Sequence, residues 1–131
     1  RENIAFGGPD ASDAEIAAAA EAALLSPVLD QLPDGMDTLL DEDGASLSGG
    51  QARRLMLARA ALRDASVLLL DEPLTGLDPA ARATVAEAIT NIADGRTTLV
   101  VHHGSLAEIR PDRWIELTRN DPPRPAMVKA S

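Results

Sequence analysis

LSGGQ at residues 47–51 and VLLLDE at residues 67–72 are the two stretches that decide the fold. The first can place a serine hydroxyl and bare glycine N–H groups at the start of a helix, where an anion such as phosphate is favoured. The second ends an apolar strand in two carboxylates. Together they describe half of a nucleoside-triphosphate site. The phosphate loop that would form the other half, G-x-x-x-x-G-K-[ST], does not occur in the sequence, whose only lysine is Lys129.

The composition fits one small, acidic domain. The chain has 131 residues, of which 45% are hydrophobic, and only Phe6 and Trp114 are aromatic, so the core must be aliphatic. The formal net charge of −9 argues against a general nucleic-acid binder, which normally carries a basic patch. The absence of cysteine excludes disulfides, thiolate metal sites and cysteine nucleophiles. No apolar run approaches the roughly 18 residues that a membrane-spanning helix needs.

Helix-start signals divide the first part of the chain. Ser12 and Glu15 form an S-x-x-E capping box ahead of an alanine-rich run, which predicts a helix over Asp13–Leu25. Ser26-Pro27 predicts a second, short helix to about Leu32. A loop rich in Asp and Glu follows and leads to the LSGGQ stretch. Its turn residues are Pro33, Gly35 and Gly44.

Helices and apolar strands alternate in the second part. Ser48 is a natural N-cap for a helix over Gly50–Arg63, and Asp78-Pro79 begins another that reaches Asp94, with Gly95 as C-terminal cap. The apolar runs predict strands buried on both faces, and the alternation predicts an α/β fold with a parallel sheet. The expected strands are Val67–Leu70, Thr97–Val101 and Arg113–Leu117. From Asn120 onward a proline-rich segment predicts a disordered tail.

Each motif has a plain structural interpretation beside the functional one. Ser-Gly-Gly by itself is more often a simple serine cap with a glycine turn than a phosphate site. Asp71 and Glu72 are expected where a strand leaves the sheet, so one carboxylate can hold Mg²⁺ through water while the other orients or deprotonates an attacking water. Two solvated acids that end a strand are the alternative. Asp78 is already explained as an N-cap.

The histidines His102 and His103 follow the second predicted strand. A histidine at the end of a strand next to the Asp71-Glu72 strand can reach a γ-phosphate. Taken singly, a structural histidine is the more frequent case.

Taken in order, these motifs resemble the C-terminal part of an ATP-binding-cassette (ABC) ATPase domain. Residues 47–51 match the family signature LSGGQ, and 67–71 match the Walker B strand. Gly76-Leu77-Asp78 resembles the D-loop, residues 97–103 resemble the switch-histidine segment, and the opening RENIAFG of residues 1–7 resembles the stretch after the Q-loop in exporters. The resemblance covers about residues 1–119 and implies a partial P-loop NTPase fold.

The resemblance implies three regions and a composite ATP site. Residues 1–47 are expected to form a helical-subdomain portion and an acidic loop, 48–119 the signature helix and the C-terminal part of the sheet core, and 120–131 the tail. Two ATPase domains are expected to pair head to tail around ATP and Mg²⁺. The implied nucleotide-binding residues are Ser48, Gly49, Gly50, Gln51 and Asp78, with Asp71 for Mg²⁺, Glu72 as general base and His103 on the γ-phosphate.

Walker A, its strand and the Q-loop are missing from this sequence, and the chain begins without methionine or a signal peptide. We therefore expect part of an ABC exporter ATPase, with the parent at the cytoplasmic face of the membrane, a transmembrane partner domain and no nucleic-acid partner. The 131-residue chain itself is expected to be soluble, inactive and prone to self-association. The alternatives are a non-transport ABC ATPase acting in DNA repair or translation, and a half-domain that regulates a partner.

Overall fold

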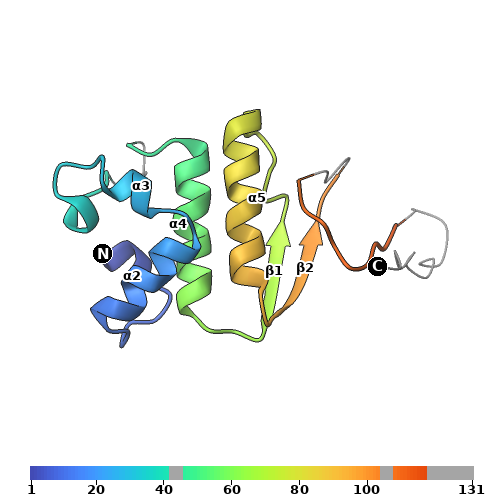
Figure 1. Ribbon diagram of the computed structural model, residues 1–131, viewed down its shortest axis with the longest axis horizontal. Coiled ribbons are helices and arrows are strands. Elements are labelled where there is room, and N and C mark those ends of the chain that lie inside the picture. Colours follow the sequence, from blue (N-terminus) through green and yellow to red (C-terminus); the bar gives the residue numbers. More distant parts are fainter. Residues whose placement is uncertain (42–45, 104–107, 118–131) are drawn as a thin grey trace.

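The computed structural model describes residues 1–41, 46–103 and 108–117, and it combines helices with a parallel strand pair (Figure 1). In chain order the elements are α1 (Glu2–Ala5), α2 (Asp13–Ala22), α3 (Ser26–Leu29), the 3₁₀ turn η1 (Gly35–Asp37), α4 (Gly49–Leu62), β1 (Val67–Asp71), α5 (Pro79–Ala93) and β2 (Thr97–Val101). The predicted tail, residues 120–131, and Gly44 of the acidic loop lie outside the described residues.

Local capping explains where the long helices begin. Ser12 accepts from the Glu15 backbone N–H while the Glu15 carboxylate accepts from the Ser12 N–H, so α2 starts at the predicted residue. The helix ends at Ala22 and does not reach Leu25, because Leu24 adopts a left-handed conformation (φ +54°) that a helix cannot continue through. α3 likewise ends at Leu29, earlier than Leu32.

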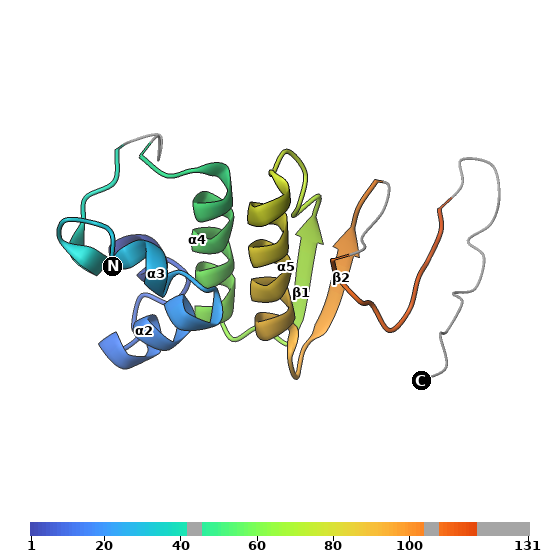
Figure 2. The same ribbon diagram turned by 45° about the horizontal axis from the view of Figure 1, so that its top comes forward.

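Helix α4 lies at the centre of the helical layer, between α1 and α2 on one side and α5 on the other (Figure 2). Leu57 and Ala58 are buried on α4, and they belong to one aliphatic core that continues into α2, α5 and β1. At the end of α4, Arg96 donates to the Ala60 and Ala61 carbonyls at 3.2 and 3.1 Å. A cation on these last carbonyls satisfies acceptors that the helix leaves open.

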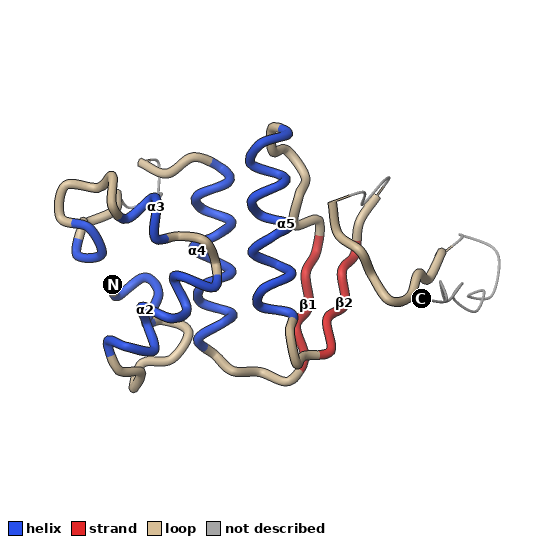
Figure 3. Tube along the Cα trace, in the orientation of Figure 1, coloured by secondary structure: helices blue, strands red, loops and turns tan. Residues whose placement is uncertain are grey.

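Strands β1 and β2 pair in parallel, with Val67 opposite Thr97 and Asp71 opposite Val101. Helix α5 makes the crossover between them and covers one face of the pair (Figure 3). This confirms the expected parallel α/β arrangement. The prediction that both strand faces are buried is wrong, since Leu69 is 70% exposed and Leu99 50% exposed. Side chains alternate along a strand, and in the described part of the chain helices pack on one face only.

The predicted third strand, Arg113–Leu117, is also wrong. Arg113 makes an isolated β-bridge, and residues 114–117 have no regular structure. An apolar run becomes a strand only when a neighbouring strand offers a continuous hydrogen-bond ladder, and this segment has a single point of contact.

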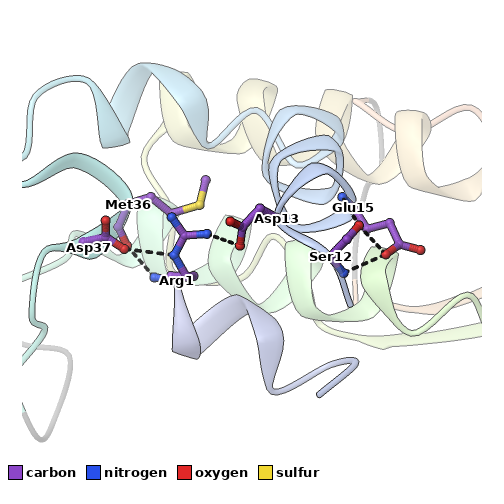
Figure 4. Close-up of polar contacts among 6 residues, drawn as sticks. All are labelled: Arg1, Ser12, Asp13, Glu15, Met36 and Asp37. Carbon is purple, nitrogen blue, oxygen red and sulfur yellow. Dashed lines mark hydrogen bonds and ion pairs between the residues drawn. The ribbon is translucent and has the colours of Figure 1, made fainter. Parts of the chain in front are cut away.

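The N-terminal elements are held together by polar contacts around Arg1 (Figure 4). Its guanidinium forms an ion pair with Asp13 at the start of α2 and donates to Asp37 Oδ1 of η1 at 3.0 Å. Both carboxylates raise the pKa of Arg1, with the hydrogen bond to Asp37 as the larger cause. The two carboxylates are largely exposed and Arg1 is 38% exposed, so the network orients α1 against α2 and η1 more than it stabilises the fold.

Candidate nucleotide-site edge

The residues singled out in the sequence gather at one end of the molecule. The N-termini of α4 and α5 and the carboxyl ends of β1 and β2 all lie at the top of Figure 1. Helix N-termini favour anions, and the carboxyl edge of a parallel sheet is where α/β proteins bind ligands. This edge therefore combines two helix N-termini, which carry a partial positive charge, with the carboxylates of Asp71 and Glu72 at the end of β1.

Ser48 is the N-cap of α4 and forms a second capping box. Its hydroxyl accepts from the Gln51 N–H at 3.3 Å, and the Gln51 side-chain oxygen accepts from the Ser48 N–H at 2.8 Å. The first N–H groups of a helix have no partner inside the helix. Since Ser48 takes the N–H of Gln51, the N–H group of the exposed Gly49 and the Ser48 hydroxyl proton stay available to an anion.

The two glycines of the signature stretch differ in their surroundings and in their structural roles. Gly49 is exposed, and a Cβ there would lie 3.4 Å from the Leu77 side chain, an ordinary contact distance. Gly50 is buried, and a Cβ there would lie only 2.9 Å from the Ala81 Cβ. Gly50 thus permits the close approach of α4 and α5, a packing role that the sequence pattern did not indicate.

Asp71 is the last residue of β1 and is exposed, whereas Glu72 turns back toward β2. The Glu72 backbone is left-handed (φ +46°), which is unfavourable for a residue with a side chain, and its N–H donates to the Val101 carbonyl at 2.9 Å. One carboxylate oxygen, Oε1, accepts from the His103 N–H at 2.8 Å. The other, Oε2, accepts from the Thr75 hydroxyl.

These contacts keep Glu72 ionised. The hydrogen bond from Thr75 is the largest cause that lowers the pKa of Glu72, and partial burial opposes it. The His103 N–H and the nearby imidazoles of both histidines lower the pKa further. A carboxylate with a lowered pKa stays unprotonated and negatively charged, the form in which it can interact with a water proton. In this conformation it is suited to orienting and polarising a water molecule.

The two adjacent histidines differ completely in environment. The His103 side chain is 94% exposed, with Nε2 3.7 Å from Glu72 Oε1, so it is free to meet a ligand at this edge. The His102 side chain is 6% exposed, with Nδ1 3.0 Å from Glu72 Oε2. Sequence reasoning did not place Thr75 or His102 beside Glu72. Thr75, three residues after Glu72 in a Pro-containing turn, was a recognisable signal for a hydroxyl-to-carboxylate contact.

Asp78 caps α5, as its Oδ1 accepts from the N–H groups of Ala80 and Ala81 at 3.0 and 2.9 Å. The side chain of Leu77, the preceding residue, lies where a Cβ added at Gly49 would come within 3.4 Å of it. The structure therefore places Leu77 beside the start of the signature stretch and groups Glu72, His102 and His103 into a separate cluster.

Comparison with known proteins now decides the family. The model of the ABC transporter family matches residues 2–75, more than half of the chain. The chain belongs to the ABC transporter family. It is part of an ABC ATPase domain, as the α/β arrangement and the signature stretch indicate.

Similar proteins extend the match to β2. The uncharacterized ABC transporter ATP-binding protein YwjA of Bacillus subtilis is 43% identical over 92% of this chain and 21% of its own length. An ATP-dependent lipid A-core flippase of Ralstonia nicotianae is 46% identical over 88% of this chain and 20% of its own. The solved structure of a bacterial Atm1-family ABC exporter with ATP bound has a TM-score of 0.67 and 36% identity, covering 78% of this chain and 18% of the exporter. The chain thus spans about a fifth of the length of these relatives.

An ABC ATPase domain implies ATP, and the carboxylates here fit a magnesium ion that accompanies it. Within residues 1–41, 46–103 and 108–117 no three His, Asp or Glu side chains are grouped as a protein-only metal site. Mg²⁺ usually takes one or two carboxylates and completes its shell with water and nucleotide phosphates. The exposed carboxylate of Asp71 at the end of β1 has the chemistry for this. Over the same part of the chain, every helix is too short or too polar to cross a membrane.

Proposed function

We propose that this chain supplies the signature and Walker B parts of the ATP-hydrolysing domain of an ABC exporter. The observation that carries the proposal is the Glu72 carboxylate, held ionised at the carboxyl edge of two parallel strands by Thr75 and the His103 N–H. Exporter relatives, the flippase and the Atm1-family protein among them, support the transport assignment. The complete transporter would lie at the cytoplasmic face of a membrane, joined to a transmembrane domain.

In this proposal the site residues have separate tasks. Asp71 holds Mg²⁺ through water, Glu72 orients the attacking water and takes its proton, and His103 binds the γ-phosphate. The signature residues 48–51 contact the nucleotide bound to a second ATPase domain, and Asp78 communicates across that dimer. When bound, Mg²⁺ neutralises charge on the transferred phosphoryl group. The exposed hydroxyl of Ser48 and the N–H group of the exposed Gly49 support the signature role.

The 131-residue chain alone is expected to bind Mg-ATP weakly and not to hydrolyse it. The sequence lacks the phosphate-cradling loop and its lysine, which supply most of the contacts to a triphosphate. Isothermal titration of the purified chain with Mg-ATP measures this directly. Micromolar affinity would contradict the expectation.

The proposed function is tested by a pair of serine variants of the complete transporter. Ser48→Ala and Ser12→Ala remove the same kind of cap, from capping boxes of matching geometry. Each is expected to cost about 1 kcal/mol of stability. Only Ser48→Ala also removes a hydrogen bond to a charged phosphate, so its ATP hydrolysis should fall about 10- to 100-fold.

The readout is the rate of ATP hydrolysis by the reconstituted transporter, with thermal unfolding measured alongside. Ser12→Ala should unfold earlier yet hydrolyse ATP at nearly the wild-type rate. Equal losses of activity in both variants would mean that Ser48 acts only as a helix cap, and the signature role would be rejected.

A further inference from the structure

We propose that His102 is a positioning residue that holds the Glu72 carboxylate in its working orientation. The inference rests on the proposed function, in which Glu72 acts on the water that attacks ATP. His103 was the histidine expected to matter, and it presents its side chain to solvent. His102 instead points into the protein, against the carboxylate itself.

The direction of His102 follows from the alternation along β2. Thr98 and Val100 lie on the face of β2 that packs toward the helices, and His102, one residue beyond the strand, continues that face. Its side chain is 6% exposed, compared with 94% for His103. A buried imidazole at the end of a strand is held in place by the residues around it. The Glu72 carboxylate therefore packs against a group that moves little.

The contact with Glu72 is close and electrostatically directed. Nδ1 of His102 lies 3.0 Å from Oε2 of Glu72, although the two are not aligned as a full hydrogen bond. Two lone pairs at this separation would repel, so the contact favours the form of the imidazole in which Nδ1 carries the hydrogen. The same Oε2 accepts from Thr75, and Oε1 accepts from the His103 N–H. Glu72 is therefore constrained from its own turn and from the end of β2.

A further ion pair lies beyond β2 and joins α5 to Glu108. Arg82, in the first turn of α5, forms a two-pronged pair with Glu108 at 2.8 and 3.3 Å. The hydrogen bond from Arg82 is the largest cause that lowers the pKa of Glu108, and the His102 imidazole is a smaller one.

Such a constraint matters because Glu72 has a long side chain on an unfavourable backbone conformation. A carboxylate that swings away from the attacking water loses rate even when ATP binds normally, and a misplacement of about 1 Å can cost on the order of 100-fold. Loss of His102 should therefore lower kcat and leave the KM for ATP nearly unchanged.

The test compares His102→Leu with His102→Asn in the complete transporter. Leucine fills the buried space without a donor, whereas the asparagine amide can donate to Oε2. We expect His102→Leu to lower kcat for ATP hydrolysis roughly 10-fold or more with KM within about twofold, and His102→Asn to recover most of the rate. Thr98→Val, on the same inward face of β2, is the matched control and should keep the wild-type kcat.

Glu72→Gln separates this inference from the proposed function. If Glu72→Gln hydrolyses ATP normally, the proposed function fails. If Glu72→Gln is inactive but His102→Leu has the wild-type kcat, only the positioning role fails. Single-turnover measurement of Glu72→Gln with and without His102→Leu should give the same residual rate, because His102 acts through the carboxylate. A further loss in the double variant, or equal losses for the leucine and asparagine variants, would overturn the proposal.

Discussion

Glu72→Gln in the complete transporter is expected to slow ATP hydrolysis by roughly 100- to 10,000-fold, the usual contribution of a positioned acid or base. The amide keeps the size of the side chain, and its oxygen can still accept from the His103 N–H or from Thr75. What it loses is the negative charge that these contacts maintain. The effect should therefore appear in kcat, and ATP should still bind.

The measurement is the hydrolysis rate of the purified transporter at saturating Mg-ATP, together with nucleotide binding by the same preparation. Glu87→Gln is the control, because Glu87 is an exposed carboxylate on α5 and makes no contact with the Glu72 cluster among the described residues. It should hydrolyse ATP at the wild-type rate. A Glu72→Gln protein that retains half of the activity or more would remove Glu72 from the catalytic role.

Leu74→Ala is expected to produce the largest loss of stability. Leu74 is fully buried in the turn that follows Glu72, and it belongs to the aliphatic core with Val85 and Ile89. Truncating a buried leucine costs about 2–5 kcal/mol, because apolar contacts are lost and a cavity remains. A loss of about 3 kcal/mol lowers the folding equilibrium constant roughly 100-fold.

Urea unfolding of the 131-residue chain, followed by circular dichroism, measures this loss. Leu69→Ala is the matched control, since Leu69 lies on β1 nearby but is 70% exposed. It should change the free energy of unfolding by no more than about 0.5 kcal/mol. If both variants lose stability equally, the outer face of β1 is covered in solution, for example by a second copy of the chain. That outcome would support the expected self-association.

The turn that follows β1 contains both residues changed in these experiments, Glu72 and Leu74. Pro73 and Leu74 are buried, so they anchor a backbone that is left-handed at Glu72. Burial of these apolar side chains offsets the unfavourable conformation that directs Glu72 toward β2. Leu74→Ala should consequently loosen the Glu72 carboxylate as well as the core, although Leu74 lies too deep to touch a nucleotide.

Local signals in the sequence determined the helix starts and the choice of candidate residues. Ser12, Ser48 and Asp78 were predicted as N-caps and cap α2, α4 and α5, because a cap depends on groups only two or three residues away. The apolar runs predicted β1 and β2, and LSGGQ with the Asp-Glu pair indicated the family that the comparison then showed. The catalytic and binding roles of Asp71, Glu72 and His103 stay predictions.

Contacts between segments distant in the sequence decided which strand faces are covered and which candidate residues lie together. Apolar runs cannot tell which layers cover them, so the exposure of Leu69 and the failure of the 113–117 strand appear only in the folded chain. The close approach of Gly50 to Ala81 likewise depends on how α4 packs on α5. His102 and His103 are neighbours of the same type in sequence. Side chains alternate between the two faces at the end of β2, so His102 is buried beside Glu72 and His103 is exposed. This difference depends on which face of β2 packs against the rest of the fold, and not on the residue type.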